Sequence, residues 1–288
     1  MPNVLEIENL NKDYGDFRLK DVSFALPQGY IMGLIGPNGA GKTTIIKLIL
    51  NLLRREGGNI KVFGLDNVND EVAVKSRIGF VHDTPFFYES LTLKSLKATV
   101  APFYKDWDDE LFYRLLREFD LPAGKLFRKL SRGMKMKFAL AVALSHHADF
   151  VILDEPTSGL DPVFRRELLA KLSALIQDEK KSVLFSTHIT SDLERIADYI
   201  TFIHNGRIVF SSARDEVLEK WAVVKAGNEL LNDDNWKFFK GIRKREFGFE
   251  ALTSDAAEAR RRFAGNAVIE KASLEDIMYY MTRGGNRA

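Results

Sequence analysis

Eight consecutive residues, Gly36–Thr43, constrain the fold of this chain more than any other segment. They read GPNGAGKT and match the pattern G-x-x-x-x-G-K-[ST], a loop that wraps a phosphate group. That pattern is meaningful only between a buried strand and a helix. Both are predicted here, because an apolar run at Tyr30–Ile35 precedes the loop and helical spacing from Thr43 to Leu53 follows it, up to Gly57. The sequence therefore predicts a strand, a glycine loop and a helix.

The residue types in this loop indicate its chemistry. Glycines let consecutive backbone N–H groups turn inward on a phosphate, and the following helix adds the positive end of its dipole. Lys42 is placed to reach the β- and γ-phosphate oxygens of a nucleotide, and the Thr43 hydroxyl is placed to bind Mg²⁺. The alternative, a glycine-rich turn with a chance lysine, leaves the agreement of the loop with both flanking elements unexplained.

A second apolar run, Phe150–Leu153, ends in the carboxylates Asp154 and Glu155. Open α/β sheets bind their ligands at the carboxyl ends of the strands, so acids at this point are suited to face a phosphate. Asp154 can orient Mg²⁺ through water, and Glu155 can polarise an attacking water molecule. Taken alone, an apolar strand that ends in acids is more often an ordinary transition to a loop. Together with the phosphate loop, the pair favours a hydrolytic nucleotide site.

Strand and helix patterns alternate along the first 214 residues. Strands are predicted at Val4–Ile7, Arg18–Ala25, Ile60–Phe63, Ile78–His82, Ser182–Ser186, Tyr199–His204 and Arg207–Phe210. Helices are predicted at Leu91–Val100, Asp109–Phe119, Met134–Ser145 and about Pro162–Ile176. This alternation predicts an α/β fold on a mainly parallel, buried sheet, with residues 84–147 as a helical insertion.

The segment after Asp215 has a different pattern, and we expect domains at 1–214 and 215–288. Its predicted elements are helical stretches to about Trp221 and at Trp236–Gly241, a strand at Arg245–Leu252, a helix at Ser254–Phe263 and a strand at Ala267–Glu270. They form a small α+β module. Two basic runs in it, Arg243–Arg245 and Arg260–Arg262, are suited to phosphate, but nearby acids make a solvated face the better interpretation.

Composition narrows the function further. The 288 residues include 42 Lys and Arg and 40 Asp and Glu, so a net charge of +2 creates no overall field that favours nucleic acid. The absence of Cys excludes disulfides, thiolate catalysis and cysteine zinc sites. No apolar run approaches the roughly 18 residues that cross a bilayer, and the N-terminus lacks a secretory pattern. We expect a cytoplasmic protein that binds no nucleic acid.

Three further segments follow in a fixed order: Leu130–Met134 (LSRGM), Ser158–Asp161 (SGLD) and Ser186–His188 (STH). Together with the phosphate loop and the two acids, they resemble the ATP-binding cassette (ABC) ATPases over about residues 4–212. LSRGM is similar to the family signature LSGGQ, SGLD to its D-loop and STH to its switch-histidine segment. The resemblance implies a P-loop NTPase core with an N-terminal antiparallel β subdomain and a helical subdomain, and it implies ATP and Mg²⁺ as ligands.

The resemblance also implies a role for individual residues. The implied catalytic residues are Lys42, Glu155 and His188. The implied contacts to ATP are Tyr14 at the adenine, Gly36, Pro37, Asn38, Gly39, Ala40, Gly41, Lys42, Thr43 and Thr44 in the loop, and Ser131, Gly133 and Asp161 from the opposite subunit. Local alternatives stay open, namely a helix cap for Ser131, an incidental His188, and an ordinary half-buried strand residue for Tyr14.

One position departs from the family pattern. Ile78–Pro85 aligns with the family's Q-loop, but Asp83 stands where glutamine is usual. A carboxylate still binds Mg²⁺, so the expected metal ligands are Thr43, Asp83 and Asp154, but it cannot donate from an amide and it adds charge near the phosphates. An acid at this position, with Arg132 inside the signature, resembles ATPase subunits of bacterial ABC-2-type exporters that handle peptide antibiotics or other amphipathic compounds.

In this family each ATP site is completed by a second subunit. The resemblance therefore implies a head-to-tail dimer, of two copies or of one copy with a second ATPase subunit, around two Mg-ATP. It also implies an integral-membrane permease partner that holds the chain at the inner face of the cell membrane. The permease would dock near Asp83–Val100, with Phe86, Phe87 and Tyr88 as candidate contacts unless they pack the helical insertion.

The favoured function is thus the ATP-hydrolysing subunit of an ABC exporter. Two alternatives stay open: a soluble ABC ATPase that acts on ribosomes or DNA, and a regulatory subunit with weak hydrolysis.

Overall fold

A computed structural model describes residues 2–283, and the described residues form three β-sheets. The first sheet is antiparallel, with strand order β2-β1-β4-β5. Its strands are β1 (Asn3–Asp13), β2 (Arg18–Pro27), β4 (Gly57–Val62) and β5 (Leu65–Asp66). Its apolar face packs on α1 (Lys42–Ile49) and on one face of the central sheet, and α2 (Glu71–Lys75) follows it. This sheet is the N-terminal antiparallel subdomain that the family resemblance implies.

The central sheet has the strand order β10-β9-β3-β8-β7-β6. Its strands are β3 (Ile31–Ile35), β6 (Ile78–Val81), β7 (Phe150–Asp154), β8 (Ser182–Thr187), β9 (Tyr199–His204) and β10 (Arg207–Ala213). All neighbouring strands are parallel except β9 and β10. β3, β7 and β8 are buried along their whole length because other elements cover both faces. The predicted mainly parallel, buried sheet is confirmed.

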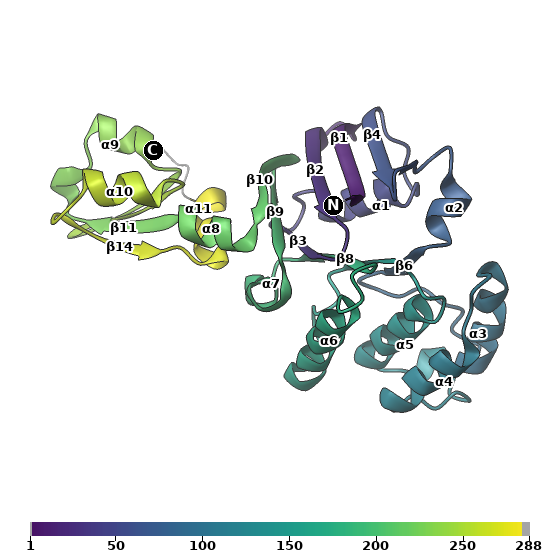
Figure 1. Cartoon of the computed structure of the whole chain (residues 1–288). Helices are drawn as coiled ribbons and strands as arrows, with labels where there is room; N and C mark the ends of the chain where they lie inside the picture. Colours follow the sequence, from purple (N-terminus) through teal and green to yellow (C-terminus); the bar gives the residue numbers. More distant parts are fainter. Residues whose placement is uncertain (1, 284–288) are drawn as a thin grey trace.

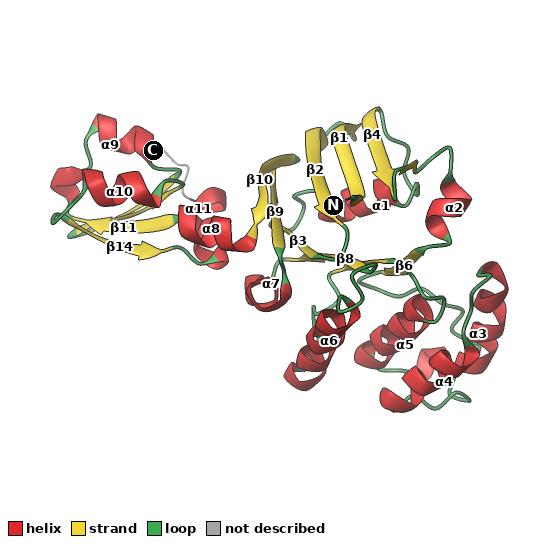
Figure 2. Cartoon of the chain, in the orientation of Figure 1, coloured by secondary structure: helices red, strands yellow, loops and turns green. Residues whose placement is uncertain are grey.

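Helices lie on the side of the central sheet that is opposite the first sheet (Figure 1). They are α3 (Leu93–Val100), α4 (Asp109–Glu118), α5 (Arg132–Leu144), α6 (Pro162–Leu175) and α7 (Thr190–Ile196), with short 3₁₀ turns at Ala101–Phe103 and Phe127–Lys129. Figure 2 shows that residues 84–147 form a group of helices without a sheet of their own. Buried rings of Phe112, Phe127 and Phe138 pack edge to face at its centre.

The predicted helix Thr43–Leu53 is wrong at its C-terminal end. α1 stops at Ile49, because Asn51 adopts a left-handed conformation with φ 50° and the Leu52 N–H donates back to Lys47 O at 2.8 Å. This six-to-one bond is typical of a helix terminus. Asn51 therefore ends the helix before Gly57 is reached.

The third sheet lies beyond the β10 edge of the central sheet (Figure 1) and is antiparallel, with order β12-β13-β11-β14. The elements of this segment are α8 (Arg214–Lys220), β11 (Ala222–Ala226), a 3₁₀ turn (Asn228–Leu230), α9 (Asp233–Phe238), β12 (Gly241–Arg245), β13 (Gly248–Thr253), α10 (Ala256–Arg262), β14 (Ala267–Lys271) and α11 (Leu274–Arg283). The sequence patterns missed β11, β12 and α11. The single strand predicted at Arg245–Leu252 is instead the second half of a β12–β13 hairpin.

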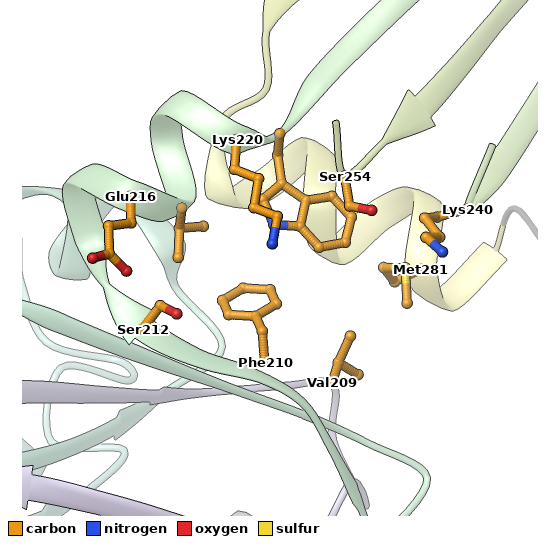
Figure 3. Close-up of a pocket in the computed structure, with 10 residues that line it drawn as sticks. Val209, Phe210, Ser212, Glu216, Lys220, Lys240, Ser254 and Met281 are labelled. Atoms are coloured by element: carbon orange, nitrogen blue, oxygen red, sulfur yellow. The ribbon is translucent and has the colours of Figure 1, made fainter. Parts of the chain in front are cut away.

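This third sheet shares a core with the rest of the chain. Val217, Trp221 and Leu252 belong to the same buried cluster as the helical group, and the rings of Phe210 and Trp221 lie 5.6 Å apart. A pocket of about 410 Å³ lies at this junction, and Figure 3 shows Lys220 and Lys240 beside it. Apolar packing therefore fixes the C-terminal segment against β10.

The basic runs of the C-terminal segment lie on its surface. Arg245 pairs with Glu250 at 3.0 Å, and Arg261 pairs with Glu258 at 2.9 Å. These pairs support the interpretation of a solvated face with alternating charges.

Buried His146 leads to a prediction about pH. It follows α5, its Nε2 lies 3.1 Å from Ile78 O, and its ring stacks on Tyr104 at 3.8 Å. Burial lowers the pKa of His146 below its usual 6.5. As pH falls, His146 is therefore protonated in the unfolded chain before it is protonated in the folded chain. The free energy of unfolding decreases as pH falls from about 6.5 toward the lower pKa of the folded state. Between pH 7 and 5, we expect the thermal unfolding midpoint of His146→Gln to fall less than that of the unsubstituted chain.

Exposed His147 offers the matched control, because its ring is half-exposed beside Asp108. His147→Gln should keep the full loss of thermal midpoint between pH 7 and 5. An equal loss in His146→Gln and in the unsubstituted chain would show that His146 does not carry the effect.

Candidate nucleotide-binding site

Three loops of the candidate site leave the same edge of the central sheet. β3, β8 and β7 are neighbours, with Ile35 opposite Thr187 and Asp154 opposite Ser186. The residues that directly follow these three strands therefore lie side by side along this edge of the sheet. In this way the parallel register gathers the glycine loop, Glu155 and His188, which are far apart in the sequence.

The glycine loop requires glycine at two positions for different reasons. Gly41, the residue before α1, has φ 114°, a conformation that strains other residues. Gly36 lies so close to β9 that a Cβ atom there would meet Ile203 O at 2.3 Å. These constraints hold the start of α1 in the loop, where its free N–H groups and dipole favour an anion.

Lys42 lies in the loop with its side chain only 6% exposed. Its ammonium donates to Gly36 O at 2.8 Å and lies 3.1 Å from Glu155 Oε1. The other Glu155 oxygen, Oε2, lies 2.8 Å from His188 Nδ1. The structure thus joins the three predicted catalytic residues in one chain of contacts, Lys42–Glu155–His188.

The backbone of Glu155 is itself constrained. Its φ is 48°, which is uncommon for a residue with a side chain. The Glu155 N–H donates both to the Ser186 carbonyl oxygen, at 3.0 Å, and to the Ser186 hydroxyl oxygen, at 3.1 Å. These contacts aim the carboxylate at Lys42 and His188, in an arrangement that can accept a proton beside a bound phosphate.

Asp154 is 1% exposed, and its Oδ1 accepts a bond from the Ser186 hydroxyl at 2.6 Å. Its Oδ2 is also buried but has no hydrogen-bond partner among the described residues. A buried carboxylate oxygen without a partner is costly unless a cation or water satisfies it. This oxygen therefore fits Mg²⁺, or its bound water, next to the loop. Within residues 2–283, no three His, Asp or Glu side chains form a metal-binding group.

Residues 19–158 match the ABC transporter family. The bacitracin transport ATP-binding protein of Enterococcus faecalis is 34% identical over 212 residues, which cover 73% of this chain and 69% of that protein. The chain belongs to the ABC transporter ATP-binding proteins. The protein of the same name from Bacillus licheniformis is 32% identical over the same shares of the two chains. A solved ATP-binding subunit of an ABC transporter has a TM-score of 0.67 and 31% identity, over 75% of this chain and 92% of that one.

This ABC protein is therefore an ATP-binding, ATP-hydrolysing subunit of a transporter, and its P-loop ATPase fold agrees with the fold expected from the sequence. In residues 2–283, no helix has the length and apolar character needed to cross a membrane.

The two segments that resemble partner-facing ABC motifs lie against each other. Ser131 precedes α5 and accepts from Met134 N at 3.2 Å, and Asp161 precedes α6 and accepts from the first N–H groups of that helix. These backbone donors also lower the pKa of Asp161. Between the two caps, Arg132 packs over Gly159, where an added Cβ would lie 2.9 Å from its guanidinium. Ser131 thus acts as a helix cap, and the residue is exposed at the start of α5.

Tyr14 and Asp83 lie in exposed loops. Tyr14 comes directly after the last residue of β1, is 48% exposed, and has Lys12 Nζ 5.4 Å from its ring centre, so it lies outside the strand. Asp83 follows β6, and its Oδ1 accepts from Thr84 N at 2.6 Å and lies 2.5 Å from His82 Nδ1. The Asp83 carboxylate is therefore engaged by its own loop, and its role as a metal ligand stays a prediction.

Sequence reasoning missed one element beside the site. Residues of α11 line a groove together with Pro37, Asn38 and His188. The spacing of Leu274, Ile277 and Tyr280, all buried, is a helical signal that was available in the sequence. No local signal places that helix next to the glycine loop.

Proposed function

We propose that this ABC subunit holds Mg-ATP on the Gly36–Thr43 loop and hydrolyses it with Glu155 as general base. The observation that carries the proposal is the Lys42–Glu155–His188 chain of contacts, which places a base between the phosphate-binding lysine and a histidine. The relatives' ATP-binding function supports it.

ATP binding changes the partner of Lys42 in this scheme. The γ-phosphate attracts the ammonium away from Glu155 Oε1, which leaves the carboxylate free to accept a proton. A water molecule then attacks the γ-phosphorus while Glu155 takes its proton. The bond to the β-phosphate oxygen breaks, and ADP keeps that electron pair. Lys42 and His188 stabilise the charge on the transferred group, so positioning and electrostatics supply most of the catalysis.

Thr43 and Asp154, with Asp83 as a third proposed ligand, would hold Mg²⁺. The ion supplies positive charge to the β- and γ-phosphate oxygens. The partnerless buried Oδ2 of Asp154 supports this assignment.

We propose that two such subunits close head to tail. Ser131, Gly133 and Asp161 begin α5 and α6, at or near the surface, where their polar groups are accessible to a second subunit. The contact between Arg132 and Gly159 makes the two segments one surface, so both engage the opposite ATP together. The second subunit is another copy of this chain or a related ATPase.

We further propose that a permease docks on the loop after β6. Phe86 and Tyr88 are 80% and 74% exposed, whereas Phe87 packs on Phe127 and Phe138 inside the helical group. Exposed aromatic side chains are common anchors of protein interfaces. Phe86 and Tyr88 are therefore the proposed contacts, and Phe87 is a core residue.

Docking gives a prediction for cell fractionation. Phe86→Ser with Tyr88→Ser should move most of the chain from the membrane fraction to the supernatant, because interface anchors of this kind contribute about 2 kcal/mol each. Phe247→Ser, at a ring that is 89% exposed on the C-terminal hairpin, is the matched control and should stay with the membranes. An unchanged double variant would contradict docking at this loop.

We propose export as the direction of transport, on the resemblance carried by Asp83 and Arg132, and we propose bacitracin as the compound to test, on the names of the two bacitracin transport relatives. The direction can be tested with inverted membrane vesicles prepared from cells that contain the whole transporter. Uptake of labelled bacitracin into these vesicles is then measured. ATP added outside such vesicles should drive bacitracin inward. Release of preloaded bacitracin on ATP addition would show import instead.

A further inference from the structure

The last described helix, α11, is fixed next to the nucleotide site. The Leu274 N–H donates to Glu194 Oε1 of α7 at 2.9 Å, and Leu274 and Ile277 are buried in the same cluster as Leu193. α7 begins two residues after His188. α11 is thus docked on the helix that continues the histidine loop.

The packing of α11 on α7 leaves a groove of about 460 Å³ between α11 and the glycine loop. One wall contains Pro37, Asn38 and His188, and the other contains Tyr279, Thr282 and Arg283. Pro37 and Asn38 belong to the phosphate loop itself. A nucleotide held on that loop therefore has its terminal phosphate near the groove.

Arg283 is the basic side chain that lines this groove. Its guanidinium is exposed and has no carboxylate partner among residues 2–283. The acidic side chain that lines the groove, Glu275, lies eight residues earlier on α11, about 12 Å away along the helix axis. The groove beside the phosphate loop is thus lined by a cation and a carboxylate that lie far enough apart on α11 not to pair with each other.

We propose that α11 is a wall of the nucleotide site and that Arg283 contacts the terminal phosphate of ATP bound in the same chain. A guanidinium matches the planar pairs of oxygens on a phosphate, and no ion pair to a carboxylate of residues 2–283 has to break before Arg283 reaches them. The assignment rests on the proposed binding of ATP to the loop. It gives the C-terminal segment a direct role in distinguishing ATP from ADP.

Calorimetric titration of the full chain with a non-hydrolysable ATP analogue and with ADP tests the assignment. Because the contact is made only to the third phosphate, Arg283→Ala should weaken the affinity for the ATP analogue about 10-fold. It should change the affinity for ADP less than twofold. Arg283→Lys should recover part of the loss, since it keeps the charge but not the fork of donors.

The matched control is Arg260→Ala, which removes an exposed arginine of α10 from the same segment and lowers the net charge equally. It should leave both affinities unchanged. Equal weakening of the analogue and ADP by Arg283→Ala, or no change in either, would overturn the contact while leaving the proposed function intact. Failure of the unsubstituted chain to bind either nucleotide would overturn both.

Discussion

Replacing Glu155 by Gln is expected to lower steady-state ATP turnover by about 10²–10³-fold and to leave ATP binding nearly unchanged. The amide keeps the size of the side chain and an oxygen that can accept from Lys42, but it cannot take a proton from water. Measurement of phosphate release, with ATP affinity measured on the same preparation, separates the two effects.

Glu167→Gln is the matched control, because Glu167 is exposed on α6 and the same charge is removed away from the site. It should turn over ATP at the rate of the unsubstituted chain. Turnover of Glu155→Gln within a factor of two of that rate would remove Glu155 from the role of base.

The same variant also reports on assembly. Blocked hydrolysis should trap the closed state, so light scattering should show the mass of a dimer with Mg-ATP and of a monomer without it. A monomer that binds ATP but does not pair would mean that this chain does not close with its own copy, and it would point to a different ATPase subunit or to a requirement for the permease.

Replacing Lys42 by Ala is expected to weaken ATP binding at least about 100-fold and to abolish measurable turnover. The ammonium lies inside the loop beside Gly36 O, where in the proposed function it would donate charge-assisted hydrogen bonds to phosphate. ADP binding should fall as well, since the loop holds the β-phosphate. The loss for both nucleotides distinguishes this variant from Arg283→Ala.

Two controls define the contribution of Lys42. Lys61→Ala removes an exposed lysine of β4 and should bind ATP normally. Lys42→Arg keeps the charge but places a wider group in a site with almost no exposed surface, so it should recover little. Normal turnover in Lys42→Ala would contradict the assigned site.

The central part of the site was predictable because its residues follow buried strands. Apolar runs identified β3, β7 and β8, and each run is followed by a chemically distinctive residue, so a parallel sheet brings these residues to one edge. Periodicity does not give the order β3-β8-β7. That order is a result of the structure, seen in the pairing of Ile35 with Thr187 and of Asp154 with Ser186.

What the sequence did not predict depends on contacts between distant segments. The engagement of Asp83 by Thr84 and His82 is a property of loop conformation that residue identity does not reveal. The place of α11 depends on the bond from Leu274 to Glu194 and on apolar packing across 80 residues of sequence. The expected domain boundary near residue 214 stays a prediction, and the core shared by Trp221 and Leu252 with the helical group shows how closely the two sides are packed.

The neighbouring positions of β3, β8 and β7 have an evolutionary consequence. The three loops that carry chemistry leave one edge of the sheet, while the helical group is inserted between β6 and β7 and the C-terminal segment follows β10. Lengthening or replacing those two segments does not alter the register of the three strands. Such a chain can therefore vary the outer surfaces of both segments while the strands that align Lys42, Glu155 and His188 keep their arrangement.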